Sequence, residues 1–170
     1  MRLFMVRRNL FFLLFILFLF HNLNGQINPD SITIVRDKWG VPHIFAKTDA
    51  EVAYGFAWAT AEDDFATMQG QLLPIKGKMG LVYGKDGAIA DVAVHVLGIR
   101  DTVEARYESD LSPAFRNVVE AYAEGVNAYA KSHKREVLRK DLFPVEGKDI
   151  IKAYKLGTSL MAGINRNHTA

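Results

Sequence analysis

The chain has 170 residues, with 21 Lys and Arg against 19 Asp and Glu and no cysteine. The lack of cysteine excludes a disulfide scaffold, cysteine-based zinc sites and a thiol nucleophile. The near balance of charge, without a basic stretch interleaved with aromatics, gives no indication of nucleic-acid binding.

The N-terminus has the three parts of a secretory signal peptide. Basic residues between positions 2 and 8 precede an uninterrupted apolar run over 10–20, and residues 21–26 are mostly polar or small. The apolar run is shorter than the ~20 residues that a membrane-spanning helix needs. The order predicts a signal peptide over 1–25, cut after Gly25, and a periplasmic or secreted protein that meets the membrane only through this peptide. The alternative is an uncleaved membrane anchor.

Two short runs rich in β-branched residues follow. Residues 31–35 and 41–46 read as strands, and 37–40 as the turn between them, with Gly40 free to adopt positive φ. The pattern predicts an N-terminal hairpin. Because two strands do not make a self-sufficient sheet, we expect the hairpin to lie on helices or to join a sheet from elsewhere.

The rest of the mature region, within a predicted domain over 26–170, reads as mostly helical. Thr48 and Glu51 form a capping-box pattern, which predicts a helix that ends near Pro74. The glycine-rich stretch 76–91 reads as a loop with one short element at 81–83, and a helix ending near Glu108 follows.

Two further helices are indicated near the C-terminus. Ser112 and Pro113 are typical of a helix start, and one apolar face follows at helical spacing: Phe115, Val118, Val119, Tyr122, Val126 and Tyr129. After a charged connector over 131–140, a last helix is expected over 148–164. Its expected buried side carries Ile150, Ile151, Tyr154, Leu160, Met161 and Ile164.

No self-contained catalytic group of residues emerges from the chain. We interpret His43 as structural rather than catalytic, because it stands alone in the second predicted strand, and His95 and His133 have no partner at metal-ligand spacing. Three adjacent carboxylates at 62–64 splay apart on a helix, so we expect them to pair with arginines or face solvent. No Gly-x-Ser-x-Gly motif is present.

Several segments nevertheless resemble the α subunit of the penicillin acylase family, which includes the acyl-homoserine-lactone acylases. Residues 34–46, Ile-Val-Arg-Asp-Lys-Trp-Gly-Val-Pro-His-Ile-Phe-Ala, resemble the opening of that subunit. Residues 61–69 are similar to its Ala-Gln-Asp-Arg-x-x-Gln-Met helix, with Asp64 in place of the arginine. Residues 121–129, Ala-Tyr-Ala-Glu-Gly-Val-Asn-Ala-Tyr, are similar to its Gly-Tyr-Ala-x-Gly-x-Asn pattern.

The resemblance implies an N-terminal nucleophile hydrolase of αββα fold, of which this α+β chain, a hairpin followed by mostly helices, is an incomplete portion. Such enzymes cleave themselves into two subunits and hydrolyse a linear amide of a small N-acyl substrate. The partner β subunit carries the N-terminal Ser nucleophile, which lies outside this chain. The resemblance implies no cofactor or metal ligand in this chain, because the carboxylate that helps some members bind calcium would lie beyond Ala170. Calcium is therefore expected only in the assembled enzyme.

The last helix resembles the one that lines the acyl pocket in this family. On that basis we expect four residues to contact substrate: Leu160, Met161, Ile164 and Asn165. The alternative for each is ordinary core packing. For the whole chain, the alternative is a catalytically inactive secreted helical module that binds a partner.

We predict that the exported protein begins at Gln26, because the small residue Gly25 ends the cleavage zone. N-terminal sequencing or the intact mass of the exported protein checks this. Recovery of residues 1–25 on a membrane-bound chain would instead indicate the uncleaved anchor.

Overall fold

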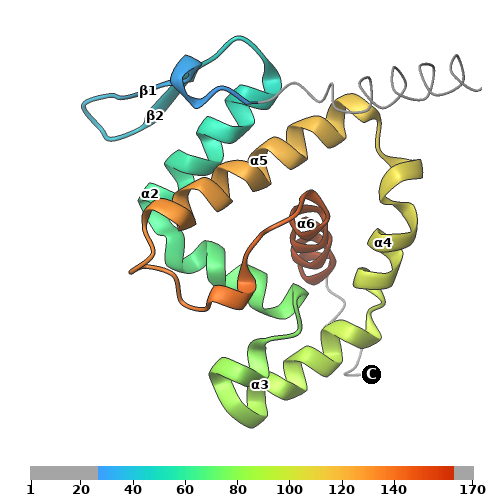
Figure 1. Ribbon diagram of the computed structural model, residues 1–170. Helices are drawn as coiled ribbons and strands as arrows, with labels where there is room; N and C mark the ends of the chain where they lie inside the picture. The colour runs from blue at the N-terminus through green and yellow to red at the C-terminus, as the bar shows by residue number, and fades with distance from the viewer. Residues whose placement is uncertain (1–26, 163–170) are drawn as a thin grey trace, which may run out of the picture.

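The computed structural model describes residues 27–162, which form a two-stranded hairpin followed by helices (Figure 1). The predicted signal peptide and the predicted site residues Ile164 and Asn165 lie outside these described residues. The expected fold class is confirmed. The elements are η1 (Pro29–Ser31), β1 (Thr33–Arg36), β2 (Pro42–Phe45), α2 (Asp49–Ile75), α3 (Met79–Val96), α4 (Ile99–Asp110), α5 (Pro113–Ser132), η2 (Lys140–Leu142) and α6 (Gly147–Met161).

The hairpin packs on α2, which is one of the two arrangements that the sequence left open. β1 and β2 are antiparallel, and Thr33 is paired with Phe45. The side chains of Ile32 and Ile44 come so close to α2 at Gly55 that a Cβ there would lie 2.8 and 2.9 Å from their Cγ2 atoms. A side chain at position 55 would therefore push the hairpin off the helix.

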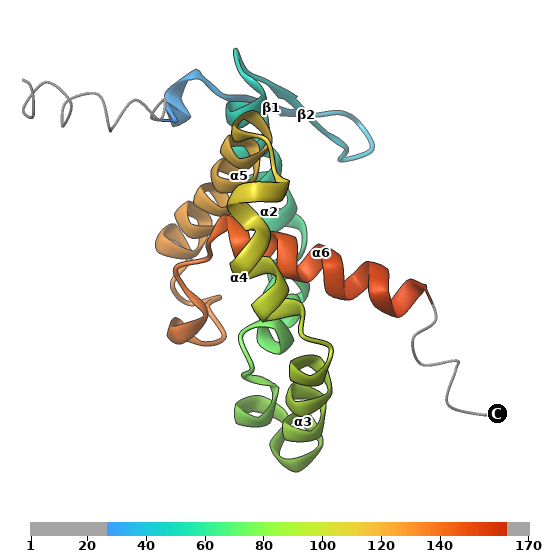
Figure 2. The same ribbon diagram turned by 90° about the vertical axis from the view of Figure 1, so that its right-hand side faces the viewer.

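Helices α2 and α5 pack against each other and form the centre of the structure (Figures 1 and 2). Small side chains line the contact, and Ala57, Ala61 and Ala123 are almost fully buried. A Cβ at Gly125 of α5 would overlap the carbonyl of Tyr54 in α2, so the two backbones approach as closely as glycine allows.

Both predicted helix starts are confirmed. The Glu51 backbone N–H donates to Thr48 Oγ1 at 3.2 Å, and the Thr48 N–H donates to the Glu51 carboxylate at 3.1 Å. At α5, the Phe115 N–H donates to Ser112 Oγ at 3.2 Å. Of the predicted apolar face, Val119, Val126 and Tyr129 are buried, whereas Phe115 is 47% exposed.

The three carboxylates at 62–64 have different partners, because adjacent helical residues point in different directions. Arg36 pairs with Glu62 at 3.1 Å and with Asp63 at 2.9 Å, as predicted. Asp64 lies at a kink in α2, with φ −157° and ψ 71°, and its carboxylate accepts the Thr67 N–H at 3.0 Å. Asp64 thus caps the second half of α2.

The loop predicted over 76–91 is wrong for residues 79–91, which belong to α3, and only residues 76–78 connect α2 to α3. The carboxylate of Asp91 accepts the N–H groups of Met79 and Gly80 at 3.1 and 2.9 Å, so a residue later in the chain caps the first turn. Gly84 adopts φ 63° and reverses the chain inside α3. The glycines therefore permit two short helical segments to fold onto each other.

The expected buried side of the last helix is wrong for its C-terminal half. Tyr154, Leu160 and Met161 are 72%, 52% and 89% exposed, whereas Asp149 and Lys152 are 5% and 7% exposed. Figure 2 shows why: α6 begins within the helical body, and its C-terminal half projects away from it.

The N-terminal half of α6 is held by an ionic network with α2 and α4. Asp149 pairs with Lys76, at the end of α2, at 2.8 Å. Lys148 and Lys152 both donate to the Glu104 carboxylate of α4, at 2.8 and 2.7 Å. These bonds, that from Lys148 first, hold the pKa of Glu104 below its usual value.

Polar side chains of α5 fix the segment that precedes α6. Asn127 makes two hydrogen bonds with the Val145 backbone, at 2.8 and 2.7 Å. Glu120 accepts the Gly147 N–H at 3.0 Å and the Tyr107 hydroxyl at 2.7 Å. A carboxylate at the first N–H of α6 is also favoured by the helix dipole.

We predict that Gly125→Ala destabilises the protein by about 1–3 kcal/mol, because the new methyl group must displace the α2 backbone. Glu124→Ala, a change to an exposed neighbour on the same helix, is the matched control. Urea unfolding of both variants measures the difference. Equal stabilities would show that α2 and α5 do not rely on close contact at this point.

We also predict an acid-sensitive contribution from Glu104. Because its pKa is lowered in the folded state, its stabilisation is present above the unfolded value of 4.5 and is lost as the pH falls through the folded value. Glu104→Gln should lower the unfolding free energy by about 1 kcal/mol at pH 7, since the carboxylate is half exposed. Below pH 4.5 the unfolding free energy of Glu104→Gln should fall less steeply with pH than that of wild type or of Glu124→Gln. Urea unfolding at a series of pH values measures this. Parallel pH profiles would contradict this assignment.

Candidate functional site

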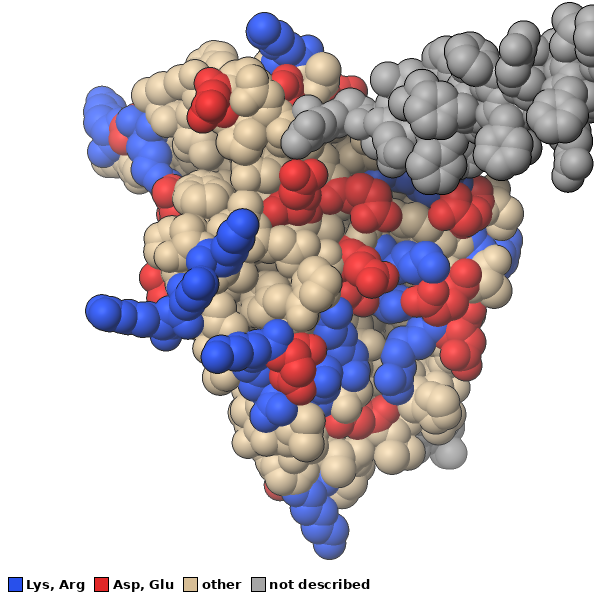
Figure 3. Space-filling view, viewed as in Figure 1, with Lys and Arg blue, Asp and Glu red and all other residues tan. Residues whose placement is uncertain are grey.

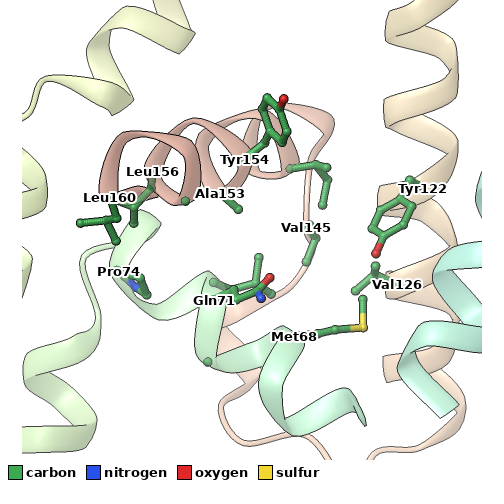
Figure 4. Close-up of a pocket in the computed structure, with 14 residues that line it drawn as sticks. Met68, Gln71, Pro74, Tyr122, Val126, Val145, Ala153, Tyr154, Leu156 and Leu160 are labelled. Atoms are coloured by element: carbon green, nitrogen blue, oxygen red, sulfur yellow. The ribbon is translucent and has the colours of Figure 1, made fainter. Parts of the chain in front are cut away.

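A cavity of about 520 Å³ lies between α2, α5 and α6 (Figure 4). This volume is within the range of pockets that bind small molecules. The lining residues are Met68, Gly70, Gln71, Leu72, Pro74, Tyr122, Val126, Val145, Ile150, Ala153, Tyr154, Leu156, Gly157 and Leu160.

The walls of the cavity are formed by α2, α5 and α6. The second half of α2, after the kink at Asp64, supplies Met68 and Pro74, and α5 supplies Tyr122. The α6 wall is positioned by the bonds at its N-terminus. In Figure 4, the Tyr154 ring points away from α2, so Ala153 and Leu156 form more of the α6 wall than it does.

No charged residue lines the cavity among the described residues. Its polar side-chain groups are the Gln71 amide and the hydroxyls of Tyr122 and Tyr154. Burial raises the pKa of the Tyr122 hydroxyl, and a hydrogen bond with Thr60 acts in the opposite direction. The net direction keeps Tyr122 uncharged at neutral pH, so the cavity suits an uncharged, mainly apolar group.

The cavity lining holds neither a hydroxyl nucleophile paired with a base nor two carboxylates. Within residues 27–162, no group of three or more His, Asp or Glu side chains could hold a metal ion. That calcium is bound only in the assembled enzyme stays a prediction. The cavity in the described part of the chain has the volume and lining of a candidate binding site, and its lining lacks a paired nucleophile and base.

The predicted substrate-binding residues have different outcomes. Leu160 lines the cavity, so the structure places it where it could contact a ligand. Met161 is the next residue but is 89% exposed and lies outside the lining. That either residue contacts substrate stays a prediction, as it does for Ile164 and Asn165.

Sequence reasoning missed the α2 and α5 walls as parts of the site. The apolar spacing of Tyr122 and Val126 predicts only a buried helix face, because helical periodicity does not reveal a gap in the packing of that face. Met68, Gln71 and Pro74 give no signal of their own, since they become a wall only when α6 crosses α2.

His43 does not belong to the cavity. Its Nε2 lies 3.6 Å from Asp37 Oδ2 on the hairpin, and its side chain is 53% exposed. Asp37 also accepts the N–H groups of Trp39 and Val41 at 2.8 and 3.0 Å, which organises the turn. The contact fits the structural interpretation of His43.

A second cavity of about 420 Å³ lies between α4, α5 and α6 and differs in its charges. Arg106, Asp110 and Lys155 line it, and Arg106 pairs with Asp110 at 2.9 Å. On the face shown in Figure 3, basic and acidic side chains are interspersed.

No helix in the described range is long and apolar enough to span a membrane.

Known proteins with similar sequences and structures are acylases. The chain is 32% identical to penicillin G acylase of Escherichia coli over 105 residues, which are 62% of this chain and 12% of that protein. It is 26% identical to the acyl-homoserine lactone acylase PvdQ of Pseudomonas fluorescens (strain Pf0-1) over 134 residues, 72% of this chain and 17% of that protein. The chain thus spans less than a fifth of the length of these curated relatives.

The fold is also similar to that of a solved acylase. A thermostable penicillin G acylase from Alcaligenes faecalis, in a tetragonal crystal form, matches with a TM-score of 0.63 and 24% identity, over 82% of this chain and 75% of that chain. The family model described as penicillin amidase matches residues 31–152. Because this match covers well over half of the sequence, the chain belongs to the penicillin amidase family.

Proposed function

We propose that this chain is the N-terminal, α-subunit-like part of a secreted amidase that hydrolyses the linear amide of N-acyl substrates, of the penicillin or acyl-homoserine-lactone type. The observation that carries the proposal is the family match over residues 31–152. The uncharged cavity beside α6 supports it, since an acyl group is uncharged and largely apolar.

In this proposal the described chain binds the acyl group, and the partner subunit supplies the nucleophile. A Ser at the N-terminus of a β subunit attacks the amide carbonyl, and its own α-amino group, with a pKa near neutrality, takes the hydroxyl proton. Hydrogen-bond donors stabilise the tetrahedral oxyanion, and the α-ammonium group returns its proton to the nitrogen as the C–N bond breaks and the amine departs. Water then attacks the ester, which releases the carboxylic acid and regenerates the Ser hydroxyl. The described chain alone is then inactive, because its cavity lining lacks a nucleophile–base pair.

Exposed apolar side chains support the existence of a partner subunit. Trp39 and Phe45 of the hairpin are 78% and 61% exposed, and Met161 of α6 is 89% exposed. Large exposed apolar surfaces are typical of interaction sites. The hairpin is also a two-stranded sheet with open edges, to which further strands could add.

Mass spectrometry of the native exported protein, purified under mild conditions, tests this proposal. We expect the chain to be bound to a larger chain that begins with Ser, and replacement of that Ser by Ala to abolish hydrolysis of N-acyl substrates while leaving the complex intact. A soluble monomer that hydrolyses no N-acyl substrate would overturn the proposal and favour the inactive binding module.

A further inference from the structure

The helical glycines of this protein fall into two groups. Glycine within a helix is destabilising relative to alanine, so a helical glycine calls for a physical reason. For most of them the reason is packing: a Cβ at Gly55, Gly125 or Gly147 would overlap the hairpin, the α2 backbone or the Tyr107 hydroxyl, respectively. Within α3, a Cβ at Gly80 would press against Ala88, and a Cβ at Gly87 would overlap the Met79 carbonyl.

Gly70 and Gly157 have no such reason. Apart from its chain neighbours and the backbone of its own helix, a Cβ at either position would meet no atom of the described residues within 4 Å, and neither residue has positive φ. Both residues line the 520 Å³ cavity, Gly70 from α2 and Gly157 from α6. Gly84 of α3 is explained by its positive φ. The two helical glycines that neither packing nor positive φ explains are both cavity residues, one on α2 and one on α6.

From this coincidence we propose that Gly70 and Gly157 determine which acyl groups the protein accepts. With no side chain at either position, the space between α2 and α6 stays open to a ligand. A larger residue would extend into that space without displacing the described part of the chain, because none of residues 27–162 occupies it. This inference rests on the proposed function, because it assumes that the acyl group of the substrate binds in the cavity.

The chemistry of the lining defines the class of acyl group. An ionised group in the cavity would lose its hydration without gaining an ionic partner, because no charged side chain lines it. The occupant is therefore an uncharged alkyl or aryl acyl group. The Gln71 amide and the Tyr122 hydroxyl are the polar side-chain groups that the α2 and α5 walls contribute to the lining.

The test compares Gly157→Leu, Gly70→Leu and Gly157→Ala with Thr158→Leu in the intact exported protein. Thr158 is exposed, lies next to Gly157 and does not line the cavity, so it is the matched control. Calorimetric binding of octanamide and butanamide gives the first readout, with the fold checked by circular dichroism. Each leucine variant should weaken octanamide binding at least about tenfold relative to butanamide.

The control and Gly157→Ala should bind both amides nearly as wild type does. Gly157→Ala should also raise the melting temperature by about 2–4 °C, because alanine favours the helix. Equal octanamide affinity in wild type and in folded leucine variants would overturn the inference, as would the absence of octanamide binding to wild type. If Gly157→Leu does not fold, Gly70→Leu on the opposite wall gives the same comparison.

Hydrolysis of N-octanoyl and N-butyryl p-nitroanilides separates this inference from the proposed function. Amide binding that depends on Gly157, without hydrolysis of any anilide, would support the cavity assignment and overturn the amidase. Hydrolysis with an unchanged octanoyl-to-butyryl ratio in the leucine variants would support the amidase and overturn the role of the two glycines.

Discussion

Helices α2 and α5 approach each other so closely that no side chain fits between Gly125 and the Tyr54 carbonyl, and this approach determines where the later elements can lie. α5 carries Glu120 and Asn127, which fix the segment leading into α6. Lys76, the residue that follows α2, pairs with Asp149 of α6. The α6 wall of the cavity thus depends on how α2 and α5 are placed relative to each other.

The two halves of α6 differ in what surrounds them. Its first two turns bury Asp149 and Lys152, whose charges are paired with Lys76 and Glu104. The Lys76–Asp149 pair is largely buried, so removing one partner is costly, whereas Glu104 is half exposed and its pairing with Lys152 contributes less. Both pairs determine where the N-terminal half of α6 lies. The second half exposes apolar side chains instead and borders the cavity only at its inner side.

This arrangement agrees with a site that is completed from outside the chain. The cavity offers volume and an apolar lining but no reactive group, and the exposed end of α6 lies beside it. The nucleophile that we propose a partner subunit supplies would need a fixed position relative to the cavity wall. On this side, ionic and polar bonds at the N-terminus of α6 hold that wall in place.

Local rules determined the parts of this protein that depend on neighbouring residues in the sequence. The hairpin, the caps at Thr48 and Ser112 and the family resemblance all follow from short patterns. Tertiary structure alone decided the rest. The first turn of α3 is capped by Asp91 from beyond the kink at Gly84. α6 buries Asp149 and Lys152 because Lys76, which follows α2, and Glu104 of α4 pair with them. The cavity is a gap between three helices, and periodicity within one helix carries no information about such a gap.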